Sequence, residues 1–151
     1  MVTNVYQEDM EYISGAESID WKLLAGKTIF ITGGTGLIGS TVINGLLYAN
    51  NKYKLNVRII ALVRNLDRAK GLFHNVNAGT SLSFIVGSVE SLPEVREKVD
   101  YIIHGASPTA SLYFVQHPVE TIQTAVKGTK NILELAKKKK GKNNPTQAST
   151  G

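Results

Sequence analysis

The sequence predicts an α/β fold built on a doubly wound parallel sheet. Continuous apolar runs alternate with segments in which apolar residues recur every three or four positions, the pattern of strands separated by helices. Most of the apolar runs stop at glycine, which favours a sharp turn after a buried strand. Because each run is apolar throughout, we expect helices on both faces of the sheet, joined by right-handed crossovers.

The first half of the chain carries two expected strands. Residues 28–32 form a short apolar run that stops at a pair of glycines, and residues 57–63 form a second run rich in Val and Ile. Between them, apolar residues at helical spacing continue as far as Leu47, and the polar residues 50–52 end the helix. These segments predict a strand, a crossover helix and a second, parallel strand.

The second half continues this alternation. Residues 66–73 are expected to form a short helix, and residues 82–86 and 99–104 the third and fourth strands. Pro118 suits the first turn of a long helix that runs into the lysines near residue 140. The apolar face of this helix holds Val119, Ile122, Val126, Thr129, Leu133 and Ala136.

The predicted sheet has four strands in the order 3-2-1-4 and is truncated before a fifth strand.

Composition divides the 151 residues into three segments. Residues 1–25 lack a sustained period and are expected to be an N-terminal extension, of which the apolar side chains between residues 19 and 24 could pack onto the domain. Residues 26–140 are expected to form the folded domain. Residues 141–151 form a polar tail that we expect to be disordered.

The formal net charge of +5 is distributed unevenly along the chain. Residues 1–20 contain acids and no Lys or Arg, whereas residues 137–142 are rich in lysine. A lysine run of this kind is typical of a solvated helix end, where cations complement the helix dipole. We therefore predict no nucleic-acid partner, and the alternative interpretation is a tail that binds polyanions.

Composition also argues against several classes of protein. No apolar run approaches the roughly 20 residues that span a bilayer, and the first residues lack the pattern of a secretory signal, so we expect no membrane association. The absence of cysteine excludes disulfide scaffolds, thiolate metal sites and cysteine nucleophiles. It also suits a reducing compartment, and a cytoplasmic location is expected.

The turn at residues 32–39, Thr-Gly-Gly-Thr-Gly-Leu-Ile-Gly, carries the clearest chemistry. It lies between a strand and a helix, where one glycine can supply the sharp turn, a second can let phosphate approach the backbone, and a third can let the helix pack closely. Free N–H groups at the helix start, together with the positive end of the helix dipole, bind pyrophosphate. The turn therefore predicts a Rossmann-type site for NAD or NADP. A P-loop is excluded because no Gly-Lys-Ser/Thr follows.

The end of the second strand is a second candidate region, because this edge of a dinucleotide fold reads the adenosine ribose. NAD enzymes usually place Asp or Glu here, whereas this chain has Val63, followed by Arg64 and Asn65. Arg64 would meet a 2′-phosphate with a cation, which favours NADP. The same side chain could instead stack on adenine or face solvent.

Three segments together resemble the extended short-chain dehydrogenase/reductase family: the glycine turn, the strand at 100–104 with its following small residues, and Val-Lys-Gly-Thr at 126–129. The resemblance covers about residues 26–140 and is greatest to the nucleotide-sugar epimerases, dehydratases and decarboxylases. It implies a dinucleotide cofactor and, in the full-length protein, a nucleotide-sugar substrate. It further implies contacts to the pyrophosphate from Gly33, Thr35, Gly36, Leu37, Ile38 and Gly39, to the adenine from Ser88 and Val89, and to the nicotinamide side from Gly105, Ala106 and Ser107.

The family uses a catalytic tyrosine and a lysine four residues later, and the match in this chain is Tyr48 and Lys52. The first helix carries this pair toward the opposite edge of the sheet, on the order of 15 Å or more from the glycine turn. No catalytic residue is therefore predicted, and the resemblance implies the cofactor-binding part of an enzyme. The alternative is a non-catalytic NAD(P)-binding sensor or interaction module. An open edge on the fourth strand predicts a homo-oligomer.

Histidine and glycine residues outside the turn are expected to have structural roles. His104 ends a strand and is interpreted as a wall residue rather than an acid or base. Gly128 lies inside a helix, where glycine costs about 1 kcal/mol relative to alanine, which indicates close packing on the sheet. His74 and His117 lack the spacing of metal ligands, so no metal site is predicted.

Overall fold

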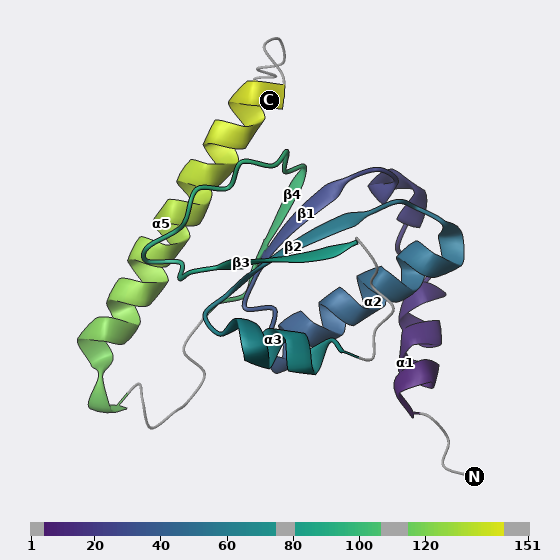
Figure 1. The fold of residues 1–151 in the computed structure, drawn as a ribbon, viewed down its shortest axis with the longest axis horizontal. Coiled ribbons are helices and arrows are strands. Elements are labelled where there is room, and N and C mark those ends of the chain that lie inside the picture. Colours follow the sequence, from purple (N-terminus) through teal and green to yellow (C-terminus); the bar gives the residue numbers. More distant parts are fainter. Residues whose placement is uncertain (1–4, 75–80, 107–114, 144–151) are drawn as a thin grey trace.

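The computed structural model describes residues 5–74, 81–106 and 115–143 (Figure 1). Ser107 and residues 144–151 of the predicted polar tail lie outside the described residues. The elements in chain order are α1 (Val5–Ser14), the short 3-10 helix η1 (Trp21–Leu24), β1 (Thr28–Thr32), α2 (Leu37–Tyr53), β2 (Arg58–Val63), α3 (Leu66–Leu72), β3 (Leu82–Val86), β4 (Tyr101–His104) and α5 (Pro118–Asn143).

The strands form one parallel sheet in the order β3-β2-β1-β4, which confirms the predicted α/β, Rossmann-type arrangement. β1 is central, with Thr32 paired to Leu62 of β2 on one side and to His104 of β4 on the other. The carboxyl ends of these strands therefore meet at one edge of the sheet. β4 occupies an outer position, and its far side has no strand partner among the described residues.

Two of the strands begin later than predicted because polar side chains replace the first ladder bonds. Asn50 bonds both backbone groups of Val57: its Oδ1 accepts from the Val57 N–H at 2.8 Å, and its Nδ2 donates to the Val57 carbonyl at 3.3 Å. The Asp100 carboxylate accepts from the Thr28 N–H at 2.9 Å. The regular ladders therefore start at Arg58 and at Tyr101.

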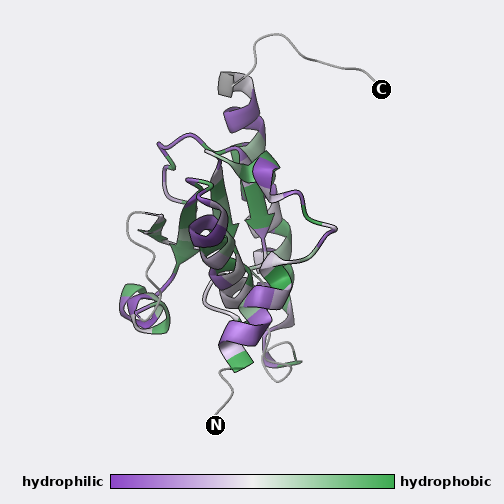
Figure 2. Cartoon of the chain, turned by 90° about the vertical axis from the view of Figure 1, so that its right-hand side faces the viewer, coloured by the Kyte–Doolittle hydropathy of each residue, from purple (hydrophilic) through white to green (hydrophobic). Residues whose placement is uncertain are grey.

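The core has two layers, one on each face of the sheet, because successive residues of a strand point to opposite faces. Ile29 and Ile31 pack with Ile43 and Leu47 of α2, whereas Phe30 packs with Ile132 of α5. Figure 1 shows α5 on one side of the sheet and α2 and α3 on the other, and Figure 2 shows the strands green between helices that carry purple, hydrophilic residues. Each fully buried aliphatic or aromatic side chain contributes about 1.5–3 kcal/mol.

The apolar face predicted for α5 does not meet the core. Spacing identifies a stripe on a helix but not the surface that covers it, and here a second stripe is buried, made of Gly128, Ile132, Leu135 and Lys139. The predicted face instead points to solvent, and four of its side chains are between 61% and 65% exposed: Val119, Ile122, Val126 and Leu133.

The first 25 residues contain more regular structure than the expected extension. α1 packs against α2 through Met10 and Ser14, which are 2% and 1% exposed, and Ile13 lies over Gly45. The helix buries only these two residues, and Tyr12 is 84% exposed. Of the lead-in that follows, Trp21 and Leu24 pack against the core, as the sequence suggests, whereas Ile19 and Leu23 are exposed.

The lysine-rich end of α5 differs from the solvated helix end that the sequence predicts. Lys137, Lys138 and Lys140 are exposed, but Lys139 is 6% exposed, and its ammonium donates to the carbonyl oxygens of Val95 and Glu97, each at 2.6 Å. The helix continues to Asn143, past residue 140. None of the helices in the described ranges is long and apolar enough to cross a bilayer.

Candidate functional site

The glycine turn joins the end of β1 to the start of α2. Gly33 has a φ of +75°, a backbone conformation that residues other than glycine rarely adopt. A Cβ atom on Gly33 would also collide with the carbonyl group of Gly105, which follows β4. Gly33 therefore supplies the turn and lets the end of β4 come close to it. The turn is closed by a hydrogen bond from the Gly36 N–H to the Gly33 carbonyl at 3.0 Å.

The two later glycines of the motif differ in their surroundings. A Cβ atom on Gly39 would collide with the Gly33 carbonyl, so Gly39 lets the first turn of α2 pack on the loop. Gly36 has φ −81° and ψ 171°, a conformation open to any residue, and a Cβ there would meet only the Gly33 oxygen, at 3.3 Å. The conformation of Gly36 is thus open to other residues, and an added Cβ would make one tight contact there rather than a collision.

The start of α2 has an uncompensated positive end. The first turn contains no acidic residue and no side chain caps it, and the N–H groups of a first turn have no acceptor within the helix. Thr35 is half-buried, while Leu37 and Ile38 are 86% and 79% exposed. The surface beside the turn therefore combines free N–H donors with two uncovered apolar side chains, a combination that suits an anionic group attached to a larger organic ligand.

A chain of hydrogen bonds connects the turn to β4 and α5. Thr32 Oγ1 lies 2.7 Å from Nδ1 of His104 and accepts from the Ala106 N–H at 3.2 Å. The other ring nitrogen of His104 lies 3.3 Å from Oγ1 of Thr129 in α5. Both nitrogens of His104 therefore have structural partners, in agreement with its interpretation as a wall residue. The chain of bonds holds Gly105 and Ala106 beside the turn.

The residues after β2 have different roles. Arg64 is exposed at the carboxyl edge of the sheet. Asn65 is the N-cap of α3, and its Oδ1 accepts from the Arg68 N–H at 2.8 Å. The cap uses the side-chain oxygen of Asn65 and satisfies one of the free N–H groups at the start of α3.

The residues after β3 are held by α5. Val89 is 5% exposed and packs against Gly128, where an added Cβ would lie 2.6 Å from a Val89 methyl carbon. Gly128 thus provides the close packing that the sequence indicates, although its neighbour is this loop rather than a strand. The side chain of Asn131 donates to the carbonyl oxygens of Val89 and Glu90, at 2.8 and 3.1 Å. The Val89 side chain is therefore not exposed to a ligand at this edge, and Ser88 before it is half-buried.

Glu90 is a residue of this edge that the sequence motifs do not identify. Its Oε1 accepts a hydrogen bond from Thr124 Oγ1 of α5 at 2.5 Å. This hydrogen bond lowers the pKa of the Glu90 carboxyl from its ordinary value, and the nearby charge of Arg64 lowers it further. The sequence feature that could have identified Glu90 is its position as an acidic residue three positions after Gly87, at the edge where the strands end.

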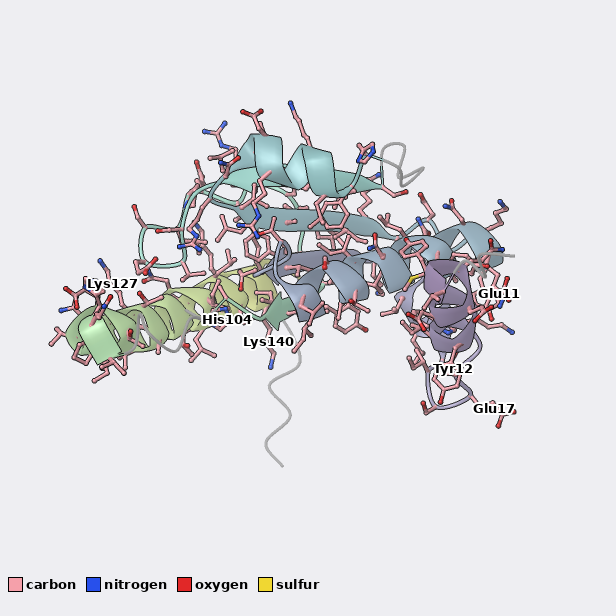
Figure 3. All side chains as sticks on the ribbon, turned by 90° about the horizontal axis from the view of Figure 1, so that it is seen from below. Glu11, Tyr12, Glu17, His104, Lys127 and Lys140 are labelled. Atoms are coloured by element: carbon pink, nitrogen blue, oxygen red, sulfur yellow. The ribbon has the colours of Figure 1, made fainter. Side chains whose placement is uncertain are left out.

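Tyr48 and Lys52 attach α1 to α2. The Tyr48 hydroxyl donates to the Glu11 carboxylate at 3.4 Å, and the Lys52 ammonium donates to Ser14 Oγ at 3.1 Å. Figure 3 shows Glu11 near one end of the molecule and His104, which marks the carboxyl end of β4, well away from it. The tyrosine and lysine pair therefore has a structural role far from the glycine turn.

Other kinds of site find no support in the parts of the chain that the structure describes. No group of three or more His, Asp or Glu side chains there could hold a metal ion. A surface hollow is lined by Asn56, Val57, Arg58 and Ser81. It lies where β2 and β3 begin, at the edge of the sheet opposite to the glycine turn.

A parallel sheet with a glycine turn between its first strand and its first helix is the arrangement of Rossmann-type dinucleotide-binding domains. The chain belongs to the NAD dependent epimerase/dehydratase family, whose family model matches residues 29–151. This membership agrees with the resemblance inferred from the glycine turn and the two later segments, and it implies an NAD(P) cofactor.

Several proteins are similar to this chain. A UDP-glucose 4-epimerase from Rickettsia prowazekii is 32% identical over 123 residues, which are 76% of this chain and 34% of that protein. An uncharacterized membrane protein from Methanocaldococcus jannaschii is 33% identical over 112 residues, which are 73% of this chain and 32% of that protein. The X-ray structure of Pen from Bacillus thuringiensis matches the fold with a TM-score of 0.63 and 20% identity, over 77% of this chain and 35% of that one. The chain thus spans about one third of the length of these relatives.

Proposed function

We propose that this chain is the cofactor-binding part of an NAD(P)-dependent enzyme that modifies a nucleotide sugar. The observation that carries the proposal is the difference among the glycines of the turn. A Cβ at position 33 or 39 would collide with backbone atoms, whereas position 36 has an allowed conformation and one tight contact, so its glycine also leaves room for an approaching ligand. The similarity to UDP-glucose 4-epimerases supports a nucleotide sugar as the substrate class.

The proposed cofactor fits the residues that surround the turn. Its pyrophosphate would lie against the open backbone at Gly36 and the uncapped start of α2, and its organic parts would cover the exposed side chains of Leu37 and Ile38. A nicotinamide dinucleotide, when bound, supplies a group that accepts and returns a hydride. The proposed binding residues are Gly33, Thr35, Gly36, Leu37, Ile38 and Gly39 for the pyrophosphate, Arg64, Asn65, Ser88 and Val89 for the adenosine, and Gly105, Ala106 and Ser107 for the nicotinamide side.

The proposal assigns binding and orientation to this chain, and no proton transfer. Tyr48 and Lys52 hold α1, and both ring nitrogens of His104 are engaged by threonines, so none of the three is proposed as an acid or base. We therefore expect the purified chain to bind cofactor without turnover of UDP-glucose.

Titration of the purified chain with NAD⁺ and NADP⁺ by calorimetry tests this proposal. We expect saturable heat with at least one cofactor, and its loss in Gly36→Val, because the valine side chain fills the approach to the turn while the backbone conformation stays allowed. Gly71→Ala is the matched control, since a Cβ at Gly71 meets nothing within 4 Å. Absence of heat with both cofactors at millimolar concentration, or unchanged binding in Gly36→Val, would overturn the proposal.

A second candidate function is a non-catalytic NAD(P)-binding module that acts through a protein partner or a second copy of itself. The exposed apolar side chains of α5 and the outer edge of β4 support it, because both are surfaces that another chain could cover. Light scattering tests for self-association. A monomer at high concentration, with or without cofactor, would count against a homo-oligomer.

A further inference from the structure

The adenosine end of the proposed site contains two opposite charges, Arg64 and Glu90. β2 and β3 are neighbours with Val63 paired to Val86, and the Gly87 N–H donates to the Val63 carbonyl at 2.9 Å. Arg64 directly follows Val63, and Glu90 lies in the segment that leaves the sheet after Gly87. Both residues therefore follow neighbouring strands at the same edge of the sheet, and the charge of Arg64 acts on the Glu90 carboxyl.

Glu90 is held in place by α5 rather than by its own loop alone. The Thr124 hydroxyl donates to its carboxylate at 2.5 Å, and Asn131 donates to its backbone carbonyl at 3.1 Å. Both partners belong to one helix, seven residues apart, so they lie on the same side of it. The carboxylate is therefore a fixed charge at this edge and not a mobile surface group.

Glu90 is ionised at neutral pH. The hydrogen bond from Thr124 is the largest influence and lowers the pKa of the carboxyl, and it is aided by Ser88 and by the positive charge of Arg64. Desolvation acts in the opposite direction without reversing the shift. No ion pair within 4.0 Å joins Glu90 to Arg64 among the described residues, so the two charges interact through space.

We propose that Glu90 is a specificity-determining residue that disfavours a 2′-phosphate and gives the site a preference for NAD over NADP, in spite of Arg64. The inference rests on the proposed dinucleotide function. A 2′-phosphate brings about 1.5 to 2 negative charges to this edge, where it meets a fixed carboxylate and an arginine whose charge that carboxylate already offsets. The ribose hydroxyl of NAD has no charge and escapes this repulsion.

A series of three charges at position 90 tests the proposal. The wild type, Glu90→Gln and Glu90→Lys place a negative, a neutral and a positive group at the same point, and the glutamine oxygen can still accept from Thr124. Dissociation constants for NAD⁺ and NADP⁺ are measured by calorimetry at low and high salt. We expect the affinity for NADP⁺ relative to NAD⁺ to rise about 3- to 30-fold in Glu90→Gln and further in Glu90→Lys, with smaller changes at high salt.

Glu94→Gln is the matched control. Glu94 lies in the same segment, but it is exposed and pairs with Arg96 at 3.1 Å. Its replacement should therefore leave the ratio of the NADP⁺ and NAD⁺ affinities unchanged. A ratio that does not change in Glu90→Gln and Glu90→Lys, or that changes equally in Glu94→Gln, overturns the role of Glu90. Failure of the wild type to bind either cofactor instead overturns the proposed function, so the two failures are distinguishable.

Discussion

Oγ1 of Thr32 lies 2.7 Å from Nδ1 of His104, although the two residues are 72 positions apart in the chain. Thr32 is 1% exposed and also accepts from the Ala106 N–H at 3.2 Å. One buried hydroxyl thus joins the end of β1, the end of β4 and the segment that follows β4. This relationship fixes the spacing between the glycine turn and Gly105.

Replacement of Thr32 by valine should therefore lower the stability of the fold, although valine has nearly the same side-chain shape as threonine. Thr32→Val removes the acceptor of a partly buried N–H group and a partner of the His104 ring, and we expect the free energy of unfolding to fall by about 1–3 kcal/mol. Urea unfolding followed by circular dichroism measures it. Thr41→Val is the control, because Thr41 is exposed on α2 and should change stability by about 0.5 kcal/mol or less. Equal effects of the two substitutions would contradict the prediction.

Gly39 and Gly71 form a pair of helix glycines with opposite expected responses to alanine. A Cβ at Gly39 collides with the peptide of Gly33, so Gly39→Ala should lower the free energy of unfolding by about 1–3 kcal/mol. A Cβ at Gly71 meets nothing within 4 Å, and Gly71→Ala should be neutral or stabilising by about 0.5–1 kcal/mol, since alanine is the better helix former. Thermal unfolding of both variants tests this. A stable Gly39→Ala protein would contradict the packing assigned to the turn.

Asp100 should make stability depend on acid pH. Burial raises the pKa of its carboxyl, but the hydrogen bond from the Thr28 N–H at 2.9 Å and the Lys98 ammonium at 3.0 Å outweigh burial, and the net shift is downward. A lowered folded-state pKa contributes stability above the unfolded value of about 3.9, and this contribution is lost as pH falls through the folded-state value.

Asp100→Asn should accordingly be destabilised by about 1–2 kcal/mol at pH 7, and the difference from the wild type should shrink below about pH 4. Urea unfolding across this pH range measures the difference. Asp9→Asn, on the exposed face of α1, is the control and should change stability by about 0.5 kcal/mol or less. A difference for Asp100→Asn that is constant with pH would show that the carboxylate charge is not involved.

Lys139 should behave differently from its neighbours in the lysine run. Its ammonium is the hydrogen-bond donor for the carbonyl oxygens of Val95 and Glu97, so Lys139→Met leaves two acceptors without this partner and should cost about 1–3 kcal/mol. Lys138→Met and Lys140→Met, at exposed positions, should each change stability by about 0.5 kcal/mol or less. Similar losses in all three variants would indicate a general effect of charge instead of the contacts of Lys139.

The sheet could be predicted from the sequence because its strands are signalled locally. Residues 28–32 form an uninterrupted apolar run, and all five of them are buried in β1, as a central parallel strand requires. The glycine turn could also be recognised from the sequence, because the motif lies between a predicted strand and a predicted helix, as a dinucleotide-binding turn must. The distance of Tyr48 and Lys52 from the turn followed from the direction of α2.

The features that could not be predicted depend on contacts between distant segments. The carboxylate of Glu90 is positioned by Thr124, 34 residues away, and no local pattern reports that contact. The buried stripe of α5 includes a glycine and a lysine, which hydropathy spacing excludes, while its more regular apolar stripe is the exposed one. In α1, the two buried residues are Met10 and Ser14, and the sequence does not show that α2 is the surface that covers them.

The position of β1 between β2 and β4 has a kinetic consequence. Contacts between Thr28 and Asp100 join residues 72 apart, so the central strand gains its second neighbour only after most of the domain has been synthesised. At roughly 5–20 residues per second on the ribosome, β1 waits roughly 4–14 s for β4. During that interval the strand whose residues are all buried in the finished sheet has one open edge, to which another chain could pair until β4 takes that place.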